Sequence, residues 1–297
     1  MTLAAPAKIN LHLAVGGRRS DGYHSIASIF QAVSLADTVT VAVSPGGLIE
    51  VGGNCGCNPE QNTVFKAARA FLAELPADSG SWGVRIDVDK RIPVGAGLGG
   101  GSSDAAATLK ALGAIFPGMI APSRLLRIAC GIGSDVPFFM GSACARVGGR
   151  GEVLEPLPAR QDFVVVIVDP GFPVSTRDAY ARLDEYRAGN GVPALPPDSM
   201  LDQELDRFAA AYLKESPANW PFRNDFLQPL SSQMPELVAC IGRIKATGAL
   251  YAAMSGSGSA CFGIYGDDEQ AAKAQVSLSA YYRSSIAFPL ARLPDSI

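Results

Sequence analysis

The chain has 297 residues, of which 48% are apolar, and a formal net charge of −3. This length predicts two domains or one large one, with a core that needs neither disulfides nor a structural metal. The slightly acidic charge argues against a general nucleic-acid binder, which would carry a basic stripe.

Cysteine usage and hydropathy indicate a cytoplasmic protein. The six cysteines are scattered, which is typical of reduced thiols, and the close pair Cys55 and Cys57 lacks the further ligands of a zinc site. No apolar stretch approaches the about 20 residues of a membrane span. Lys8 and Asn10 interrupt the apolar pattern of a signal peptide. We therefore expect no membrane partner and no metal cage.

The first predicted strand, residues 3–15, alternates apolar and polar side chains. A period of two residues places successive side chains on opposite faces of a strand. One face is therefore predicted to be apolar and to consist of Ile9, Leu11 and Leu13. The opposite, polar face is predicted to consist of Lys8, Asn10 and His12.

Further elements follow in chain order. Alternating or β-branched residues predict strands at 37–43, 82–88, 163–168, 249–254, 260–265 and 286–291. Helical apolar spacing predicts helices at 62–75, with Asn62 as the N-cap, and at 102–115, 123–132, 176–187, 202–214, 235–246 and 267–282. Strands and helices that mix without strict βαβ alternation indicate an α+β fold. Prolines near residues 155–159 predict a boundary between domains of residues 1–157 and 158–297.

Residues 93–105 are the most informative part of the sequence. They hold five glycines within seven positions, followed by two serines and a predicted helix. Glycines let a backbone approach a ligand closely, and the first turn of a helix offers free N–H groups at the positive end of the helix dipole. A plain connecting loop needs neither feature. We therefore predict a cradle for nucleotide phosphates formed by Pro93, Val94, Gly95, Ala96, Gly97, Leu98, Gly99, Gly100, Gly101, Ser102 and Ser103.

Three better-known nucleotide motifs do not account for this loop. Gly95, Gly97 and Gly100 have the spacing of a dinucleotide-binding fingerprint, but residues 115–123, about 20 positions further on, contain no acid. A P-loop requires a Gly-Lys pair, and the chain has none. The catalytic-loop and Asp-Phe-Gly motifs of protein kinases are absent as well.

The same loop resembles the signature loop of the GHMP kinases, the superfamily of galactokinase, homoserine kinase and the mevalonate kinases. Their usual Gly-Leu-x-Ser-Ser-Ala core is longer here, as Gly-Leu-Gly-Gly-Gly-Ser-Ser-Asp-Ala. Further family motifs are matched in the same order by residues 6–11, 19–24, 133–138, 224–226 and 254–261. The resemblance implies an N-terminal ATP-binding domain and a ferredoxin-like C-terminal domain, with the site in the cleft between them. In this family the last strand, here about residues 286–291, can return to the first domain.

The resemblance implies catalytic roles for two residues that the sequence alone would assign to structure. Gly-Ser-Asp is an everyday turn sequence, and a lysine on a strand is usually solvated, so neither Asp135 nor Lys8 stands out by itself. In the family pattern, Asp135 accepts the proton of the substrate hydroxyl, and Lys8 keeps that carboxylate ionised. Phosphoryl transfer depends on such positioning and charge neutralisation. His12 would face the same cleft, but it receives no role.

The longer glycine loop and the Asp-Gly-Tyr-His turn resemble one branch of the family, whose substrate is a small alcohol carrying a cytidylyl group. Tyr180 either stacks on the base or packs on its helix, and residues 255–259 form either part of the cleft or a hairpin turn. ATP is the phosphate donor, and Mg²⁺ arrives with it. The implied substrate contacts are Asn10, Tyr23, His24, Thr176 and Tyr180, and the implied ATP contacts outside the loop are Asn62, Thr63 and Lys90.

Other functions of the same fold stay open on the sequence. A kinase for homoserine or mevalonate, or an ATP-dependent lyase resembling diphosphomevalonate decarboxylase, would need no cytidine pocket. A regulator without catalytic activity would be expected to have lost Asp135 or the glycine loop, and both are present. We expect a small-molecule substrate and no nucleic-acid partner. No strong self-association motif is visible, so we expect a monomer or a weak homodimer.

Overall fold

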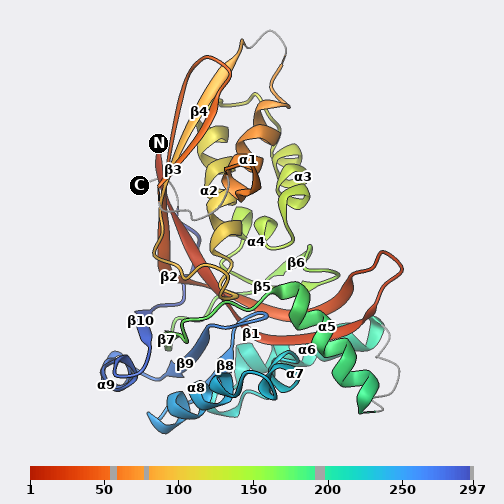
Figure 1. Ribbon diagram of the computed structural model, residues 1–297, viewed down its shortest axis with the longest axis vertical. Helices are drawn as coiled ribbons and strands as arrows, with labels where there is room; N and C mark the ends of the chain where they lie inside the picture. The colour runs from red at the N-terminus through yellow and green to blue at the C-terminus, as the bar shows by residue number, and fades with distance from the viewer. Residues whose placement is uncertain (54–58, 77–79, 191–197, 295–297) are drawn as a thin grey trace.

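The structure, a computed structural model, describes residues 1–53, 59–76, 80–190 and 198–294. Figure 1 shows an elongated molecule with a four-stranded sheet in its lower half and a six-stranded sheet that extends from the top of the molecule down to it. The last described residues lie near the start of the chain, since Leu293 and Pro294 line a small cavity together with Leu3. None of the described helices is long and apolar enough to cross a membrane. The pair Cys55 and Cys57 lies outside the described residues.

The first sheet is built around two long antiparallel strands, β1 (Thr2–Arg18) and β2 (His24–Pro45). They have 17 and 22 residues, whereas strands in globular proteins usually have roughly 5–6. This length carries both strands from the first sheet down to the second (Figure 1). The other strands of this sheet are β3 (Ile49–Gly53), β4 (Trp82–Asp89), β5 (Cys144–Gly148) and β6 (Val153–Pro156). The sheet has the order β3-β4-β2-β5-β6, and β1 pairs with β2.

Four helices pack beside the first sheet: α1 (Thr63–Leu72), α2 (Gly100–Ile115), α3 (Pro122–Ile132) and α4 (Val136–Gly141). The short 3₁₀-helix η1 (Pro59–Gln61) precedes them. As predicted, Asn62 caps α1, because its side chain accepts a hydrogen bond from the Val64 N–H at 3.1 Å. Helix α2 is buried along most of its length, and its alanines let it lie close to β1 and β2.

The second sheet is antiparallel and has the order β10-β7-β9-β8. Its strands are β7 (Val164–Asp169), β8 (Tyr251–Met254), β9 (Cys261–Tyr265) and β10 (Arg283–Ala287). Both faces of β7 are buried. On one face, Val165 and Ile167 pack in a core with β1 and β2. On the other, Val164, Val166 and Val168 pack in a core with α8 (Pro235–Ala246) and α9 (Asp268–Ser279). This double burial explains the continuous apolar run in the sequence.

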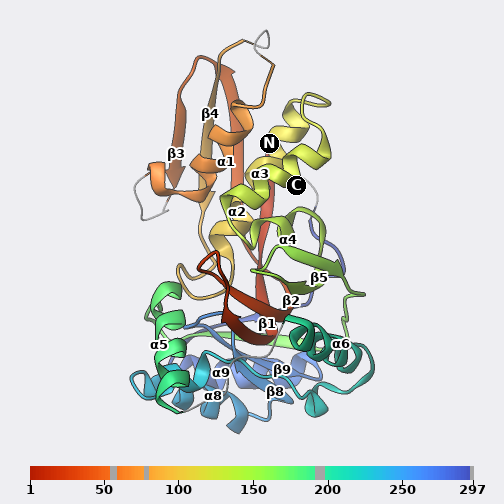
Figure 2. The same cartoon turned by 90° about the vertical axis from the view of Figure 1, so that its right-hand side faces the viewer.

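The remaining helices surround the junction of the two sheets. They are α5 (Thr176–Gly189), α6 (Asp198–Lys214), η3 (Pro217–Asn219) and α7 (Leu227–Ser231). Figure 2 shows α5 and α6 on opposite sides of the β1–β2 ribbon. A buried hydrogen bond of 2.9 Å fixes α6 in place, because the Tyr212 hydroxyl donates to the Gln31 side chain of β2.

The predicted α+β class is confirmed, because the chain forms two largely antiparallel sheets and a set of helices that pack beside them. The boundary at residues 157/158 stays a prediction; it falls between β6 and β7, which belong to different sheets. The last strand does not itself return to the first sheet, because β10 pairs with β7. Only the chain beyond it does so, where the Leu290 N–H donates to the Ala32 carbonyl at 2.9 Å.

A β-bulge at Leu11 changes the faces of β1. Asn10 pairs with Phe30 of β2, and His12 pairs with the very next residue of β2, Ile29. Strand β1 therefore has one residue more than β2 between these two pairs. Because side chains alternate with a period of two, one extra residue sends the side chains that follow, up to the next register shift after Val15, to the opposite face.

Two predictions are therefore wrong. His12 does not face the same cleft as Lys8, and Leu13 does not lie on the predicted apolar face of the strand. Leu13 and Lys8 line one cavity. The His12 ring is fully buried on the other side, with its centroid 4.0 Å from that of Phe208 and 6.0 Å from that of Phe222. A strict period of two cannot reveal a bulge, because the extra residue depends on pairing with a distant strand.

The buried His12 makes stability depend on pH. Burial, reinforced by the positive charges of Arg223 and Arg207, lowers the pKa of His12 from 6.5 to about 3. As the pH falls below 6.5, the unfolded chain takes up a proton at His12 that the folded chain does not accept until about pH 3. We expect this residue to lower the free energy of unfolding by about 1.4 kcal/mol per pH unit between roughly pH 6 and pH 4.

Urea unfolding of the wild type and of His12→Gln across that pH range measures the effect. The variant should lack this part of the slope, while carboxylates contribute equally to both proteins. Identical slopes would show that His12 gains its proton in the folded state as readily as in the unfolded chain.

Candidate active site

The glycine loop joins β4 to α2 and forms a pocket of about 340 Å³ at the N-terminus of that helix. Gly99 caps the helix with a φ of 71°, a left-handed conformation that glycine adopts without steric cost. The first turn of α2 holds no acidic residue, so its free N–H groups offer a site for anions. The pocket is lined by Gln61, Asn62, Thr63, Lys90, Pro93, Val94, Gly95, Ala96, Gly97, Leu98, Gly99, Gly100, Gly101, Ser102 and Asp104.

All the predicted ATP residues except Ser103 line this pocket. The Ser103 side chain is buried behind the loop, and its Oγ has no hydrogen-bond partner among the described atoms. Thr63 supports the loop, because its Oγ1 donates to the Gly101 carbonyl at 2.6 Å. The structure therefore gathers the predicted ATP residues on one side of the glycine loop.

Lys90 supports the same loop through two carboxylates. Its ammonium donates to Asp104 at 2.9 Å and to Asp37, and both partners are buried. Burial lowers the Lys90 pKa, but Asp104 and Asp37 more than offset it, so that the net pKa is raised. Burial also raises the pKa of Asp104 to about 7, against the opposing charge of Lys90. Lys90 therefore anchors the start of α2 as well as bordering the pocket.

The backbone at Gly97 lies against the second half of the chain. A Cβ added there would stand 2.2 Å from the Ser255 carbonyl oxygen, so no side chain fits. The Ala260 N–H donates to the Ala96 carbonyl at 3.0 Å, and the Ser255 hydroxyl donates to the Gly97 carbonyl at 3.0 Å. From β1, the Lys8 N–H donates to the Leu98 carbonyl at 2.9 Å. The loop is thus held between β1 and the turn of residues 255–259.

The predicted catalytic residues lie together at the inner end of this loop. The Lys8 ammonium is 3.6 Å from an Asp135 carboxylate oxygen, and the two side chains are 4% and 30% exposed. Burial lowers the pKa of Lys8, while the Asp135 charge opposes that change. Asn10 accepts a hydrogen bond from the Lys8 ammonium and donates to the Ser28 hydroxyl at 3.0 Å. Lys8 is therefore held rigidly, whereas Asp135 remains open to a cavity.

That cavity has a volume of about 690 Å³ and adjoins the loop pocket. Gly97 and Gly99 line both of them, so the loop is their common wall. Every predicted substrate residue lies in it. Its lining is Lys8, Asn10, Leu13, Arg18, Gly22, Tyr23, His24, Ile26, Phe30, Gly97, Gly99, Ser134, Asp135, Arg150, Thr176, Arg177, Tyr180, Ala181, Asp184, Phe226, Gly256 and Ser257.

Tyr180 packs against two other rings on the wall of the cavity. It stacks on His24 with ring centroids 4.8 Å apart, and its ring meets Phe226 edge-on at 4.8 Å. Burial, aided by the Asp135 charge, raises the pKa of Tyr180 to about 12, so the phenol stays neutral. The His24 Nε2 lies 2.9 Å from an Asp184 carboxylate oxygen, which fixes the imidazole ring. This arrangement joins α5 to the start of β2.

Sequence reasoning missed several charged residues of the cavity: Arg18, Arg150, Arg177 and Asp184. A signal for Asp184 was available, because Thr176, Tyr180 and Asp184 are four residues apart and share one face of α5. The turn that carries Arg150 has no such pattern. Its guanidinium lies 4.9 Å from the centroid of the exposed Tyr23 ring, a contact that only the fold creates.

Comparison with known proteins identifies relatives of the chain. Residues 62–142 match the GHMP kinases N terminal domain, and residues 209–284 match the GHMP kinases C terminal domain. A 4-diphosphocytidyl-2-C-methyl-D-erythritol kinase of Treponema pallidum (strain Nichols) is 38% identical over 280 residues, 94% of each chain. One of Moorella thermoacetica (strain ATCC 39073 / JCM 9320) is 38% identical over 287 residues, 96% of this chain and 97% of the relative.

Solved structures agree with these relatives. A crystal structure of 4-(cytidine 5'-diphospho)-2C-methyl-D-erythritol kinase has a TM-score of 0.80 and 34% identity, and the match covers 99% of this chain and 100% of the other. Homoserine kinase from Cytophaga hutchinsonii ATCC 33406 has a TM-score of 0.72 at 18% identity, with 98% and 94% of the two chains covered. The second likeness shows the fold alone.

The contact at Gly97 can be tested against a glycine of the same backbone conformation. Gly97 and Gly118 have φ of 79° and 75°, but an added Cβ at Gly118 would meet nothing within 4 Å. We expect Gly118→Ala to lower the free energy of unfolding by about 1–2 kcal/mol, the cost of the left-handed conformation alone. Gly97→Ala should cost more, on the order of 3 kcal/mol or above, and should weaken ATP binding as the loop shifts.

Chemical unfolding and calorimetric titration with ATP measure both effects. Equal destabilisation by the two variants, with unchanged ATP affinity in both, would show that the loop does not depend on its contact with Ser255.

Proposed function

The chain belongs to the GHMP kinase family, and on that basis we propose that it transfers the γ-phosphate of ATP to the 2-hydroxyl of 4-diphosphocytidyl-2-C-methyl-D-erythritol. This reaction belongs to the non-mevalonate route to isoprenoid precursors. The names of the relatives support the proposal. The observation that carries it is the common wall of the two pockets, because Gly97 and Gly99 would bring phosphates at α2 next to an alcohol beside Asp135.

The chemistry follows from what each side chain can do in this position. Asp135 is partly exposed to the cavity, so its carboxylate can accept the proton of an entering hydroxyl. Lys8 neutralises charge that develops between the hydroxyl and the phosphate, and Asn10 keeps it in place. The N–H groups of the glycine loop stabilise the phosphate oxygens. Phosphoryl transfer needs little more than this positioning and charge neutralisation.

The cavity suits a substrate with a base and a diphosphate. Arg18, Arg150 and Arg177 line it, together with Lys8, whereas its carboxylates are Asp135 and Asp184. A surplus of guanidinium groups favours an anionic substrate, and arginine binds phosphate oxygens in a bidentate manner. We assign the cytosine to the aromatic part of the wall, formed by Tyr23, His24 and Tyr180, with Thr176 reaching the same nucleotide.

Mg²⁺ is proposed to enter with ATP. No group of three or more His, Cys, Asp or Glu in the described part of the chain could hold a metal ion by itself. The pocket nevertheless fits a nucleotide-borne ion, because Ser102 and Asp104 are among its lining residues and carry the oxygen groups that Mg²⁺ prefers. When bound, the ion would neutralise charge on the phosphates.

The alternative functions are less well supported. Homoserine and mevalonate carry no base, and neither they nor diphosphomevalonate would use the stacked rings of His24 and Tyr180. A regulator without activity would not require the contact between Lys8 and Asp135. We therefore favour the cytidylyl alcohol. We further propose that the chain acts in the cytoplasm as a monomer or weak homodimer, with domains of residues 1–157 and 158–297 enclosing the cleft.

Asp135→Asn tests the proposed proton acceptor. The amide keeps the shape of the carboxylate but cannot take a proton, so kcat should fall about 10²- to 10⁴-fold. ADP release is measured with Mg²⁺-ATP and the cytidylyl alcohol, and with homoserine and mevalonate in parallel. Asp268→Asn, an exposed residue of α9, is the control and should keep full activity. Turnover of homoserine or mevalonate alone would overturn the proposed substrate. Full activity in Asp135→Asn would overturn the proposed role of Asp135 as proton acceptor.

Tyr180→Leu tests the aromatic wall. Loss of a stacking ring should raise the KM for the cytidylyl alcohol roughly 5- to 150-fold, because stacking on a base is worth about 1–3 kcal/mol. The KM for ATP should stay unchanged, since Tyr180 does not line the loop pocket. Tyr281→Leu, which changes an exposed tyrosine that lines neither this cavity nor the loop pocket, is the control. Equal KM values in both variants would mean that Tyr180 only packs on its helix.

A further inference from the structure

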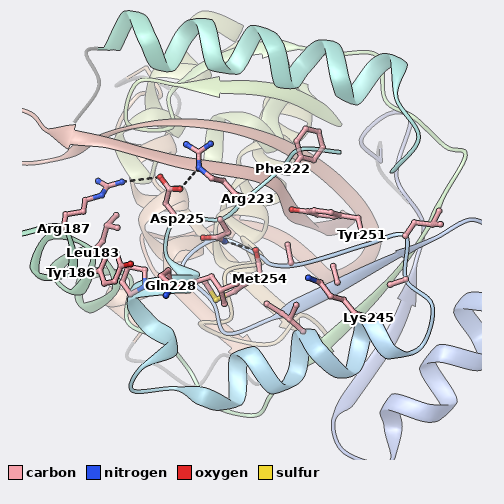
Figure 3. Close-up of a pocket in the computed structure, with 18 residues that line it drawn as sticks. Leu183, Tyr186, Arg187, Phe222, Arg223, Asp225, Gln228, Lys245, Tyr251 and Met254 are labelled. Atoms are coloured by element: carbon pink, nitrogen blue, oxygen red, sulfur yellow. Dashed lines mark hydrogen bonds and ion pairs between the residues drawn. The ribbon is translucent and has the colours of Figure 1, made fainter. Parts of the chain in front are cut away.

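A second large cavity lies on the other side of α5, with a volume of about 800 Å³ and no lining residue in common with the substrate cavity. Figure 3 shows it between α5, the segment of residues 222–229, α8 and β8, the edge strand of the second sheet. Cavities of roughly 300–1,000 Å³ are typical of sites for small organic ligands. The proposed reaction makes no use of this one.

The charged groups of this cavity are mostly cationic. Arg187, Arg223 and Lys245 line it, and Asp225 is the only carboxylate among the lining residues. Asp225 already binds both arginines, at 3.3 Å from Arg187 and 2.8 Å from Arg223, and Arg223 also binds Glu204. Lys245 forms no ion pair with any described residue. Its side chain points from the last turn of α8 into the cavity (Figure 3).

The rest of the lining is largely apolar. The Tyr251 hydroxyl donates to the Leu11 carbonyl at 3.1 Å, which leaves the ring of Tyr251 to face the cavity. Met254, Leu183 and Ile241 complete this surface. A ring or short hydrocarbon body could lie there while one acidic group reaches Lys245, an arrangement of apolar lining with few polar anchors that is usual for small-ligand sites.

We propose that this cavity is a second ligand site, which binds a small organic anion with an aromatic or aliphatic body and holds its acidic group at Lys245. The site is separate from the cleft, and it does not depend on the proposed reaction. It nevertheless shares walls with the substrate cavity. On α5, Tyr180 and Asp184 face the substrate side, whereas Leu183 and Arg187 face the second site.

The chain after α6 forms the other shared wall. Asp225 lines the second site, and the next residue, Phe226, lines the substrate cavity and packs on Tyr180. Asp225 also accepts a hydrogen bond from the Val15 N–H of β1 at 2.9 Å. A ligand that shifts this segment or α5 would therefore shift Tyr180 too. Binding at either site should change the affinity of the other by the same factor.

Two fluorescent probes test the site directly. 1-Anilinonaphthalene-8-sulfonate carries an acidic group, and N-phenyl-1-naphthylamine has the same rings without it. The Kd of each is measured by fluorescence titration of the full chain. We expect the sulfonate to bind at least about tenfold more tightly than the neutral probe, and its Kd to rise about tenfold in Lys245→Glu and less in Lys245→Gln. Lys273→Glu, which changes an exposed lysine of α9, should leave the Kd unchanged.

Circular dichroism and thermal unfolding confirm that each variant is folded. The proposal is overturned if the neutral probe binds as tightly as the sulfonate, or if Lys245→Glu binds the sulfonate like the wild type. Complete displacement of the probe by ATP or by the cytidylyl alcohol would place it in the cleft instead. Loss of probe binding as the protein concentration rises would mean that a second copy of the chain covers the cavity, and would also overturn it.

The coupling rests on the proposed function, and it is measured without turnover. The Kd of the sulfonate probe is determined with and without saturating cytidylyl alcohol, and the Kd of the alcohol with and without the probe. A matching change of about twofold or more in both is expected. If the alcohol binds but neither Kd changes, the coupling is wrong. If the alcohol does not bind at all, the proposed substrate fails while the second site stands on the probe titrations.

Discussion

The close contact between the glycine loop and the Ser255 backbone is the constraint on which the rest of the site depends. One hydrogen bond joins the loop to the turn of residues 255–259, a second joins it to Ala260 just after that turn, and a third joins it to β1. A loop clamped from both sides cannot move independently of either sheet. Its glycines therefore form a wall with a pocket on each side, and the proposed reaction would bring a phosphate in one pocket within reach of a hydroxyl in the other.

Buried charge is organised differently on the two sides of that wall. On the side of the loop pocket, Lys90 lies between two buried carboxylates, Asp37 and Asp104, an arrangement that anchors the start of α2. On the side of the larger cavity, Lys8 has one partly exposed partner, Asp135, and a neutral one, Asn10. Asp135 is therefore less enclosed than Asp37 or Asp104, which is what its proposed role as proton acceptor requires.

Helix α5 connects the proposed substrate cavity with the remainder of the second half of the chain. Its inner face positions His24 through Asp184 and Tyr180, and its outer face borders the second cavity. The guanidinium of Arg187 also donates to the Val15 carbonyl of β1 at 2.7 Å, so the helix is tied to the same strand that carries Lys8. The geometry at the reacting groups and the packing at the far side of α5 are therefore parts of one continuous structure.

The sequence by itself determined the α+β class, most of the helices and the glycine loop, because periodicity, capping and glycine spacing are local properties. It also placed Lys8 and Asn10 on one strand face. Only the tertiary structure decided that His12 leaves that face, since a bulge depends on the partner strand. The same holds for Arg150, which reaches Tyr23 from a distant turn, and for Gly97, whose need to lack a side chain arises from Ser255, 158 residues away in the chain. Contacts between distant segments leave no periodic trace in either of them.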